Sequence, residues 1–273
     1  MAGVTGALSG AAGIHDLPSA GTVAVLLVAA LVAGYLDAVV GGGGLVQLPM
    51  LLLMLPTAVP IQILATNKLS SICGTTVSAV TYGRKVRPEA RTALPLALLA
   101  LAGAVGGALT AGLISTEAFR LIVLVALVVV ASVTFLRPAL GIESTPRFHG
   151  HRHVLAAGVS GLAIGWYDGA IGPGTGTFLV FTLVGLLGMD FLRASAAAKI
   201  GNAATNLAAL LVFAPQGAPL WRLGLLMGAC NLVGGFLGAR TAIARGSAFV
   251  RVLFLVVATA LIVRLGVQVA ESF

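Results

Sequence analysis

The sequence predicts an all-α polytopic membrane protein made of two inverted-topology repeats, each with about five hydrophobic segments. Three observations support this prediction. Of the 273 residues, 59% are hydrophobic and only 9% are charged, whereas ordinary soluble domains have about 25% charged residues. The apolar residues form segments close to the roughly 20 residues that cross a bilayer. One motif also occurs twice along the chain, with a constant offset between its copies.

The apolar segments divide the chain into two halves. The first half, residues 1–136, has segments at 20–40, 45–55, 61–82, 92–114 and 119–136. A polar linker at 137–153 is predicted to be a cytoplasmic loop, and the second half, 154–273, has segments at 154–171, 175–187, 192–213, 222–242 and 249–267. The second segment of each half is shorter than a full crossing requires, so the first two segments should form a broken or re-entrant helix pair. The two halves together are predicted to form one membrane domain.

The two halves repeat in one register. Asp168 follows Asp37 by 131 positions, and the same offset aligns Lys68 with Lys199, Arg91 with Arg222, Gly103 with Gly234, Gly107 with Gly238, and Arg120 with Arg251. The fourth segments share a small-residue pattern that is typical of helix packing, at Gly103, Gly106, Gly107, Gly234, Gly235 and Gly238. An odd number of segments per repeat places the halves in opposite orientations.

Positive charges give an independent indication of orientation. They concentrate at 84–91 in the first half but at 240–251 in the second. Placing these two loops and the linker 137–153 on the cytoplasmic side satisfies the positive-inside rule with one topology. Both termini then lie outside, in a multi-pass protein of a bacterial-type inner (plasma) membrane. The net charge of +8 is thereby assigned to orientation and contact with lipid, and no nucleic-acid partner is predicted.

Several function classes lack support in the sequence. Cys73 and Cys230 lie inside apolar segments without metal-ligand spacing. The alternating histidines of the linker indicate a solvated basic loop rather than a metal site; they are His149, His151 and His153. Motifs for metalloprotease, nucleophile-elbow or phosphate-loop chemistry are absent. We therefore predict no enzymatic activity, no cofactor and no metal, while the sequence leaves open whether the chain forms a homo-oligomer.

Four charged residues lie well inside apolar segments: Asp37, Lys68, Asp168 and Lys199. A charge near the bilayer centre costs at least about 2.5 to 3.5 kcal/mol, so such residues normally face a partner or a cavity and mark a transport path. The alternative is that each aspartate pairs with a lysine only to lock helices together. Asp37 and Asp168 could hold the lysines in place, or one of them could exchange a proton.

A glycine-rich break follows each aspartate. Helix breaks at membrane depth are tolerated where the freed backbone groups are buried in protein or line a cavity, and the amides of the helix that follows favour an anion. Small neutral polar residues near the lysines suit an anion that must bind and then leave. The predicted substrate-binding residues are Lys68, Lys199, Gly41, Gly42, Gly43, Gly44, Gly172, Gly174, Thr175, Gly176, Asn67, Ser71, Thr75, Asn202 and Asn206.

These motifs resemble the sulfite exporter TauE/SafE family, or YfcA-like probable membrane transporters. The resemblance rests on residues 34–44 (GYLDAVVGGGG), 65–71 (ATNKLSS), 166–169 (WYDG) and 172–176 (GPGTG), and on Lys199. It implies a permease for small sulfur-containing or organic anions, without a bound cofactor. It also implies that the two aspartates, the glycine runs, Asn67 and the two lysines form the core of the site. Ala198 stands in the second half where the first has Asn67, so the halves are not fully equivalent.

The sequence therefore predicts a secondary transporter, an exporter of a small anion such as sulfite or an organosulfonate, with alternating access around a midplane site. An anion channel is the first alternative, with the glycine runs as its constriction. A structural or assembly protein of the membrane is the second. A cation transporter is disfavoured, because only two carboxylates lie within the membrane and lysines are the expected partners of both.

Overall fold

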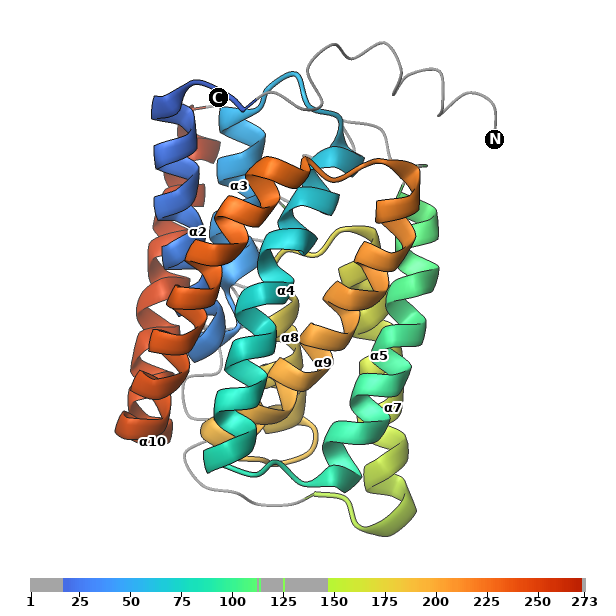
Figure 1. Cartoon of the computed structure of the whole chain (residues 1–273). Helices are drawn as coiled ribbons and strands as arrows, with labels where there is room; N and C mark the ends of the chain where they lie inside the picture. Colours follow the sequence, from blue (N-terminus) through green and yellow to red (C-terminus); the bar gives the residue numbers. More distant parts are fainter. Residues whose placement is uncertain (1–16, 112, 114–124, 126–146, 272–273) are drawn as a thin grey trace.

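The computed structural model describes residues 17–111, 113, 125 and 147–271 of the chain (Figure 1). Every regular element among these residues is helical, which confirms the all-α prediction. Four stretches are long and apolar enough to cross a membrane: Ala20–Val40, Ala90–Ala111, Phe191–Gln216 and Trp221–Val250. The predicted segment at 119–136 lies almost entirely outside the described residues.

Two helical hairpins open the two halves. In the first half, α2 (Ala20–Val40) is followed by α3 (Gly43–Met54), and in the second half α7 (Gly150–Ala170) is followed by α8 (Thr175–Gly185). The short helices have 12 and 11 residues, which corresponds to about 18 and 17 Å at 1.5 Å per residue. Both are shorter than the roughly 30 Å hydrocarbon core of a bilayer.

Glycines with positive φ end the first helix of each hairpin. Gly41 has a φ of 81° directly after α2, and Gly172 has a φ of 91° shortly after α7. Residues with a Cβ are disfavoured in this left-handed region, whereas glycine enters it without a steric penalty. The glycine runs therefore reverse the chain, as the sequence predicts for a helix break.

The polar helices α4 (Pro60–Lys85) and α9 (Phe191–Phe213) contact each other between the hairpins. In Figure 1, α4 begins at the top and ends at the bottom, whereas α9 begins at the bottom and ends at the top. α9 continues into the short 3-10 helix η1 (Ala214–Gln216). Both lysines of the predicted site lie on these two helices.

The outer helices pack across the boundary between the halves. α5 (Ala90–Ala111) lies against α7, and α10 (Trp221–Glu271) lies against α2. At Gly107 a Cβ would fall 1.9 Å from the Trp166 carbonyl oxygen, and at Gly238 it would fall 2.5 Å from the Tyr35 carbonyl oxygen. Each contact is the counterpart of the other under the 131-residue offset. The predicted packing role is thereby confirmed for Gly107 and Gly238.

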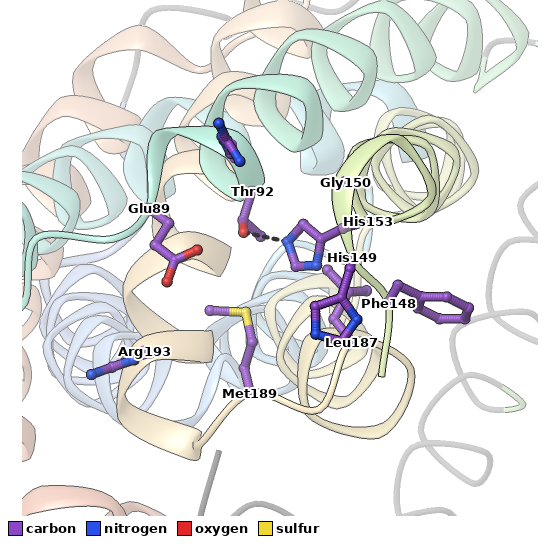
Figure 2. Close-up of a pocket in the computed structure, with 10 residues that line it drawn as sticks. Glu89, Thr92, Phe148, His149, Gly150, His153, Leu187, Met189 and Arg193 are labelled. Carbon is purple, nitrogen blue, oxygen red and sulfur yellow. Dashed lines mark hydrogen bonds between the residues drawn. The ribbon is translucent and has the colours of Figure 1, made fainter. Parts of the chain in front are cut away.

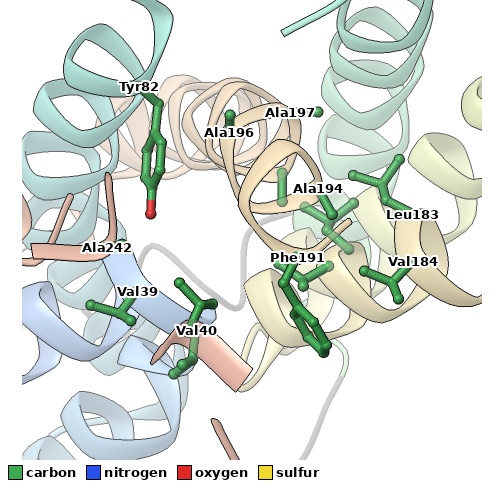
Figure 3. Packing of buried hydrophobic residues seen from close by; sticks show 14 of the residues in the cluster. Val39, Val40, Tyr82, Leu183, Val184, Phe191, Ala194, Ala196, Ala197 and Ala242 are labelled. Carbon is green, nitrogen blue, oxygen red and sulfur yellow. The ribbon is translucent and has the colours of Figure 1, made fainter. Parts of the chain in front are cut away.

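Buried apolar side chains from both halves share one core cluster. Figure 3 shows Val39 and Val40 of α2 near Ala194 and Ala196 of α9. The Tyr82 side chain at the end of α4 is fully buried in the same cluster, and its hydroxyl donates to the Ala38 carbonyl oxygen at 2.9 Å. The core thus joins the two halves beside the aspartate of the first glycine break.

The structure departs most from the predicted segments at α7 and α10. α7 begins at Gly150, four residues before the predicted start at 154, because the polar residues 151–153 can form a helical turn at the water-facing end of a span. The predicted segments 222–242 and 249–267 both fall within α10. Gly246, with a φ of 73° and a ψ of −174°, interrupts the helix between them.

Candidate functional site

Two buried ion pairs connect the halves. Lys68 Nζ on α4 lies 2.7 Å from Asp168 Oδ1 on α7, and Lys199 Nζ on α9 lies 2.8 Å from Asp37 Oδ2 on α2. The lysine side chains are 1% and 0% exposed. A buried charge without a partner is strongly destabilising, so each pair compensates a lysine that the fold removes from water. The four charged residues singled out from the sequence therefore meet pairwise, each lysine with the aspartate of the other half.

The two pairs differ in their hydrogen bonds. Lys199 Nζ donates to the Asp37 carboxylate and also to the Asp37 backbone oxygen, at 2.8 and 2.5 Å. Among the residues that the structure describes, Lys68 makes an ion pair with Asp168 alone, and Thr175 Oγ1 lies 2.5 Å from the same carboxylate oxygen. The other oxygen, Asp168 Oδ2, is buried and has no hydrogen-bond partner among the described residues.

The two glycine breaks touch each other through their backbones. The Thr177 amide donates to the Gly41 carbonyl oxygen at 3.0 Å, and the Thr177 hydroxyl donates to the Val40 carbonyl oxygen at 3.3 Å. A Cβ at Gly41 would lie 2.2 Å from the Gly176 carbonyl carbon. Only glycine permits this approach, which brings the N-terminal ends of α3 and α8 next to each other.

A small cavity of about 20 Å³ lies between the breaks and the two polar helices. It has room for about one water molecule. Its lining comes almost entirely from the residues predicted to form the site: Asp37, Gly41, Gly44, Asn67, Lys68, Ser71, Asp168, Gly172, Thr175, Gly176, Asn202 and Asn206. The sequence prediction thus identifies residues that the fold brings to one place.

Five of the predicted substrate-binding residues do not line this cavity: Lys199, Gly42, Gly43, Gly174 and Thr75. Gly42 and Gly174 are the N-cap residues of α3 and α8. A Cβ on Gly43 would fall 2.6 Å from Asp37 Cβ, so this glycine gives room to the aspartate. Thr75 accepts a hydrogen bond from Asn206 Nδ2 at 3.3 Å.

Sequence reasoning missed two polar contacts near the site. Asn231 Nδ2 on α10 donates to Gln47 Oε1 on α3 at 2.9 Å, and both side chains are buried. The Tyr167 hydroxyl, next to Asp168, donates to the Pro173 carbonyl oxygen at 2.7 Å. The signal for the first contact was present, because Gln47 and Asn231 are uncharged polar residues inside apolar segments.

A second and larger cavity, of about 230 Å³, lies where α5, α7 and α9 begin (Figure 2). Thr92 Oγ1 and His153 Nε2 are 2.7 Å apart in it, and His149 also contributes to the lining. His149 is exposed and His153 is half-buried, so lining this pocket leaves both histidines accessible to solvent. Among the described residues, no group of three or more His, Cys, Asp or Glu side chains could hold a metal ion.

Comparisons with known proteins agree on one family. The model of the sulfite exporter TauE/SafE family matches residues 26–265. A protein of Sinorhizobium sp. named "Probable membrane transporter protein ORF9" is 37% identical over 244 residues, which cover 89% of this chain and 91% of that protein. "Probable membrane transporter protein YfcA" of Escherichia coli (strain K12) is 32% identical over 244 residues, 88% of each chain. No solved structure matches the chain significantly. The chain therefore belongs to the sulfite exporter TauE/SafE family.

Proposed function

We propose that the chain is a secondary transporter that exports a small anion, such as sulfite or an organosulfonate, across the plasma membrane. The names of two relatives, both "Probable membrane transporter protein", support a transport function. The observation that carries the proposal is the position of Lys68, a buried cation on the wall of a cavity between two helix breaks. A charge held at this depth is typical of a substrate path.

The cavity wall offers donors suited to an oxyanion. Lys68 supplies a full positive charge, and the first turns of α3 and α8 supply backbone amides at the positive ends of the helix dipoles. Five neutral polar side chains also line the wall: Asn67, Ser71, Thr175, Asn202 and Asn206. Lys68 is the one cation among the described residues of this lining, and the Asp37 and Asp168 carboxylates, which also line the cavity, limit how tightly the site holds an anion.

In the proposed mechanism the two lysines have different roles. Lys68 lines the cavity and contacts the anion, whereas Lys199 does not line it and holds Asp37 through two hydrogen bonds. The sequence predicts the same role for both, because they occupy the same position in the two repeats. The difference in lining and hydrogen bonding supports assigning the anion to Lys68.

Two features support inverted repeats that alternate access to the site. α4 and α9, which correspond to each other in the repeat, run in opposite directions in Figure 1. Asn206 and Thr75 also correspond to each other, and they share a hydrogen bond. A residue can touch its own counterpart only near an axis that relates the two halves. We propose that exchange of conformation between the halves opens the site to one side and then to the other.

The cavity size favours a carrier over an open channel. A space for about one water molecule cannot admit a sulfite ion, which has four heavy atoms, so the walls must separate before it binds. For a net negative charge leaving a negative-inside cell, the membrane potential supplies about 2.3 kcal/mol per charge per 100 mV. Export then requires no second coupled ion.

Flux into and out of liposomes that contain the purified chain tests this function. Sulfite, thiosulfate, sulfoacetate, sulfate and chloride are compared, with empty liposomes as the control. A carrier is expected to saturate with at least one of these anions and to accelerate isotope uptake when the unlabelled anion is inside. Flux that does not saturate and shows no such exchange would indicate a channel, and no flux of any anion would favour an assembly role.

A further inference from the structure

We propose that the Asp168 carboxylate pairs with Lys68 in place of the substrate when no anion is bound. This pairing would allow the empty carrier to change orientation. This inference rests on the proposed function and adds a role for a residue that does not itself bind the anion. Asp168 would act as a positioning residue, because it supplies Lys68 with a negative partner whenever no anion is bound.

The geometry of the Lys68 pair supports such a replaceable partner. Lys68 Nζ has three hydrogens to donate, and within the described part of the chain its one ion-pair contact is with Asp168 Oδ1, at 2.7 Å. Both residues line the cavity, so an anion entering it would meet the lysine and the carboxylate together. An anion can therefore compete with Asp168 for Lys68 without breaking a helix.

Asp168 also has an anchor that does not depend on the lysine. Thr175 Oγ1 lies 2.5 Å from Asp168 Oδ1, at the first residue of α8. The equivalent position in the first half is Gly44, which has no hydroxyl. The Asp168 carboxylate thus keeps its Thr175 partner when Lys68 binds an anion. The first half has no equivalent hydroxyl for Asp37.

The second ion pair serves as an internal comparison. Lys199 is held by both the carboxylate and the backbone oxygen of Asp37, and it does not line the cavity. An anion cannot replace the backbone contact by competing with the carboxylate. Only the Lys68 pair is therefore arranged to exchange its negative partner for a substrate.

The consequence concerns the step in which the empty carrier changes orientation. Without Asp168, Lys68 would be a buried cation with no partner during that step, and this state is strongly disfavoured. When an anion is bound, Lys68 has a partner whether or not residue 168 is charged. Loss of the Asp168 charge should thus slow net transport much more than exchange of one anion for another.

Asp168→Asn in liposomes tests the inference, with exchange of labelled for unlabelled sulfite and net sulfite efflux measured on the same preparation. The ratio of exchange to net efflux is expected to rise at least about tenfold over the wild type, because only net efflux requires an empty carrier to return. Asp37→Asn is the matched control, in which the two rates should fall by the same factor. A folded Asp168→Asn variant with the wild-type ratio would overturn the inference while leaving the transport function intact. Absence of both activities in the wild type would instead refute the proposed function.

A second measurement applies if Asp168→Asn does not fold. The unpaired Lys68 cation would then be the cause of the failure, so the double variant Lys68→Gln, Asp168→Asn should recover a cooperative melting transition. If the double variant also fails to fold, Asp168 has a structural role unrelated to Lys68, and the inference is wrong.

Discussion

Lys199 Nζ donates two hydrogen bonds to Asp37, one to the carboxylate at 2.8 Å and one to the backbone oxygen at 2.5 Å. The lysine is fully buried, and its aspartate lies in the last turn of α2. This arrangement fixes the end of α2 just before the first glycine break. We therefore propose that the pair holds the two halves together as a structural clamp.

Removal of Lys199 is therefore expected to reduce stability. Lys199→Met would leave the Asp37 carboxylate without its cation, and breaking a buried pair by removing one partner costs about 3 to 5 kcal/mol. Unfolding in mixed micelles would measure this loss. The double variant Lys199→Met, Asp37→Asn should recover much of it, and a double variant no more stable than the single one would argue against the clamp.

Two neighbouring glycines of α5 provide a matched test of helix contact. A Cβ at Gly107 would fall 1.9 Å from the Trp166 carbonyl oxygen, whereas at Gly106 its nearest neighbour would be the Trp166 ring at 3.5 Å. Gly107→Ala is thus expected to cost about 1 to 3 kcal/mol, the usual effect of overpacking. Gly106→Ala should be close to neutral in the same unfolding measurement, and equal losses would contradict the described contact of α5 with α7.

The contact between the two glycine breaks gives a similar pair of variants. Gly41 has a φ of 81°, and a Cβ there would collide with Gly176, whereas a Cβ at Gly42 would meet nothing closer than 3.7 Å. We expect Gly41→Ala to reduce sulfite flux per folded molecule far more than Gly42→Ala does. The flux assay in liposomes checks this order, and the reverse order would show that the breaks do not meet as described.

The proposed opposite orientation of the halves would place Lys85 and Arg245 on one membrane face. In a background without Cys73 and Cys230, a cysteine placed at either position should react with a membrane-impermeant reagent only after the cytoplasmic side is opened. Modification of the two positions from opposite sides would contradict the inverted repeat and the orientation derived from the positive charges.

The sequence was sufficient to predict the helical class and the set of residues around the small cavity. That prediction rested on the 131-residue offset and on the four charges in apolar segments. Charges inside a membrane are rare, so their positions are informative. The different roles that we propose for Lys68 and Lys199 could not be predicted from the sequence. They rest on two differences: Lys199 donates a hydrogen bond to a backbone oxygen, and only Lys68 of the two lines the cavity. Neither difference can be seen in the sequence, because the two lysines align exactly in the repeat.

Other features depend on contacts between distant residues. The hydrogen bond from Asn231 to Gln47 joins positions 184 residues apart, and no local pattern pairs them. The early start of α7 was also missed, because a segment defined by apolar residues stops where polar residues begin. A helix does not need to end there when its first turn lies in the polar boundary of the membrane.

Whether Lys68 is the lysine that contacts the anion can be measured by comparing the KM for sulfite in Lys68→Gln and Lys199→Gln. Each change leaves one aspartate unpaired, so the two variants are matched in charge and in the kind of damage they cause. We expect Lys68→Gln to raise the KM at least about tenfold, which corresponds to about 1.4 kcal/mol. Lys199→Gln should leave the KM near the wild-type value. A folded Lys68→Gln variant with the wild-type KM, or an equal rise in both variants, would contradict the assignment of the anion to Lys68.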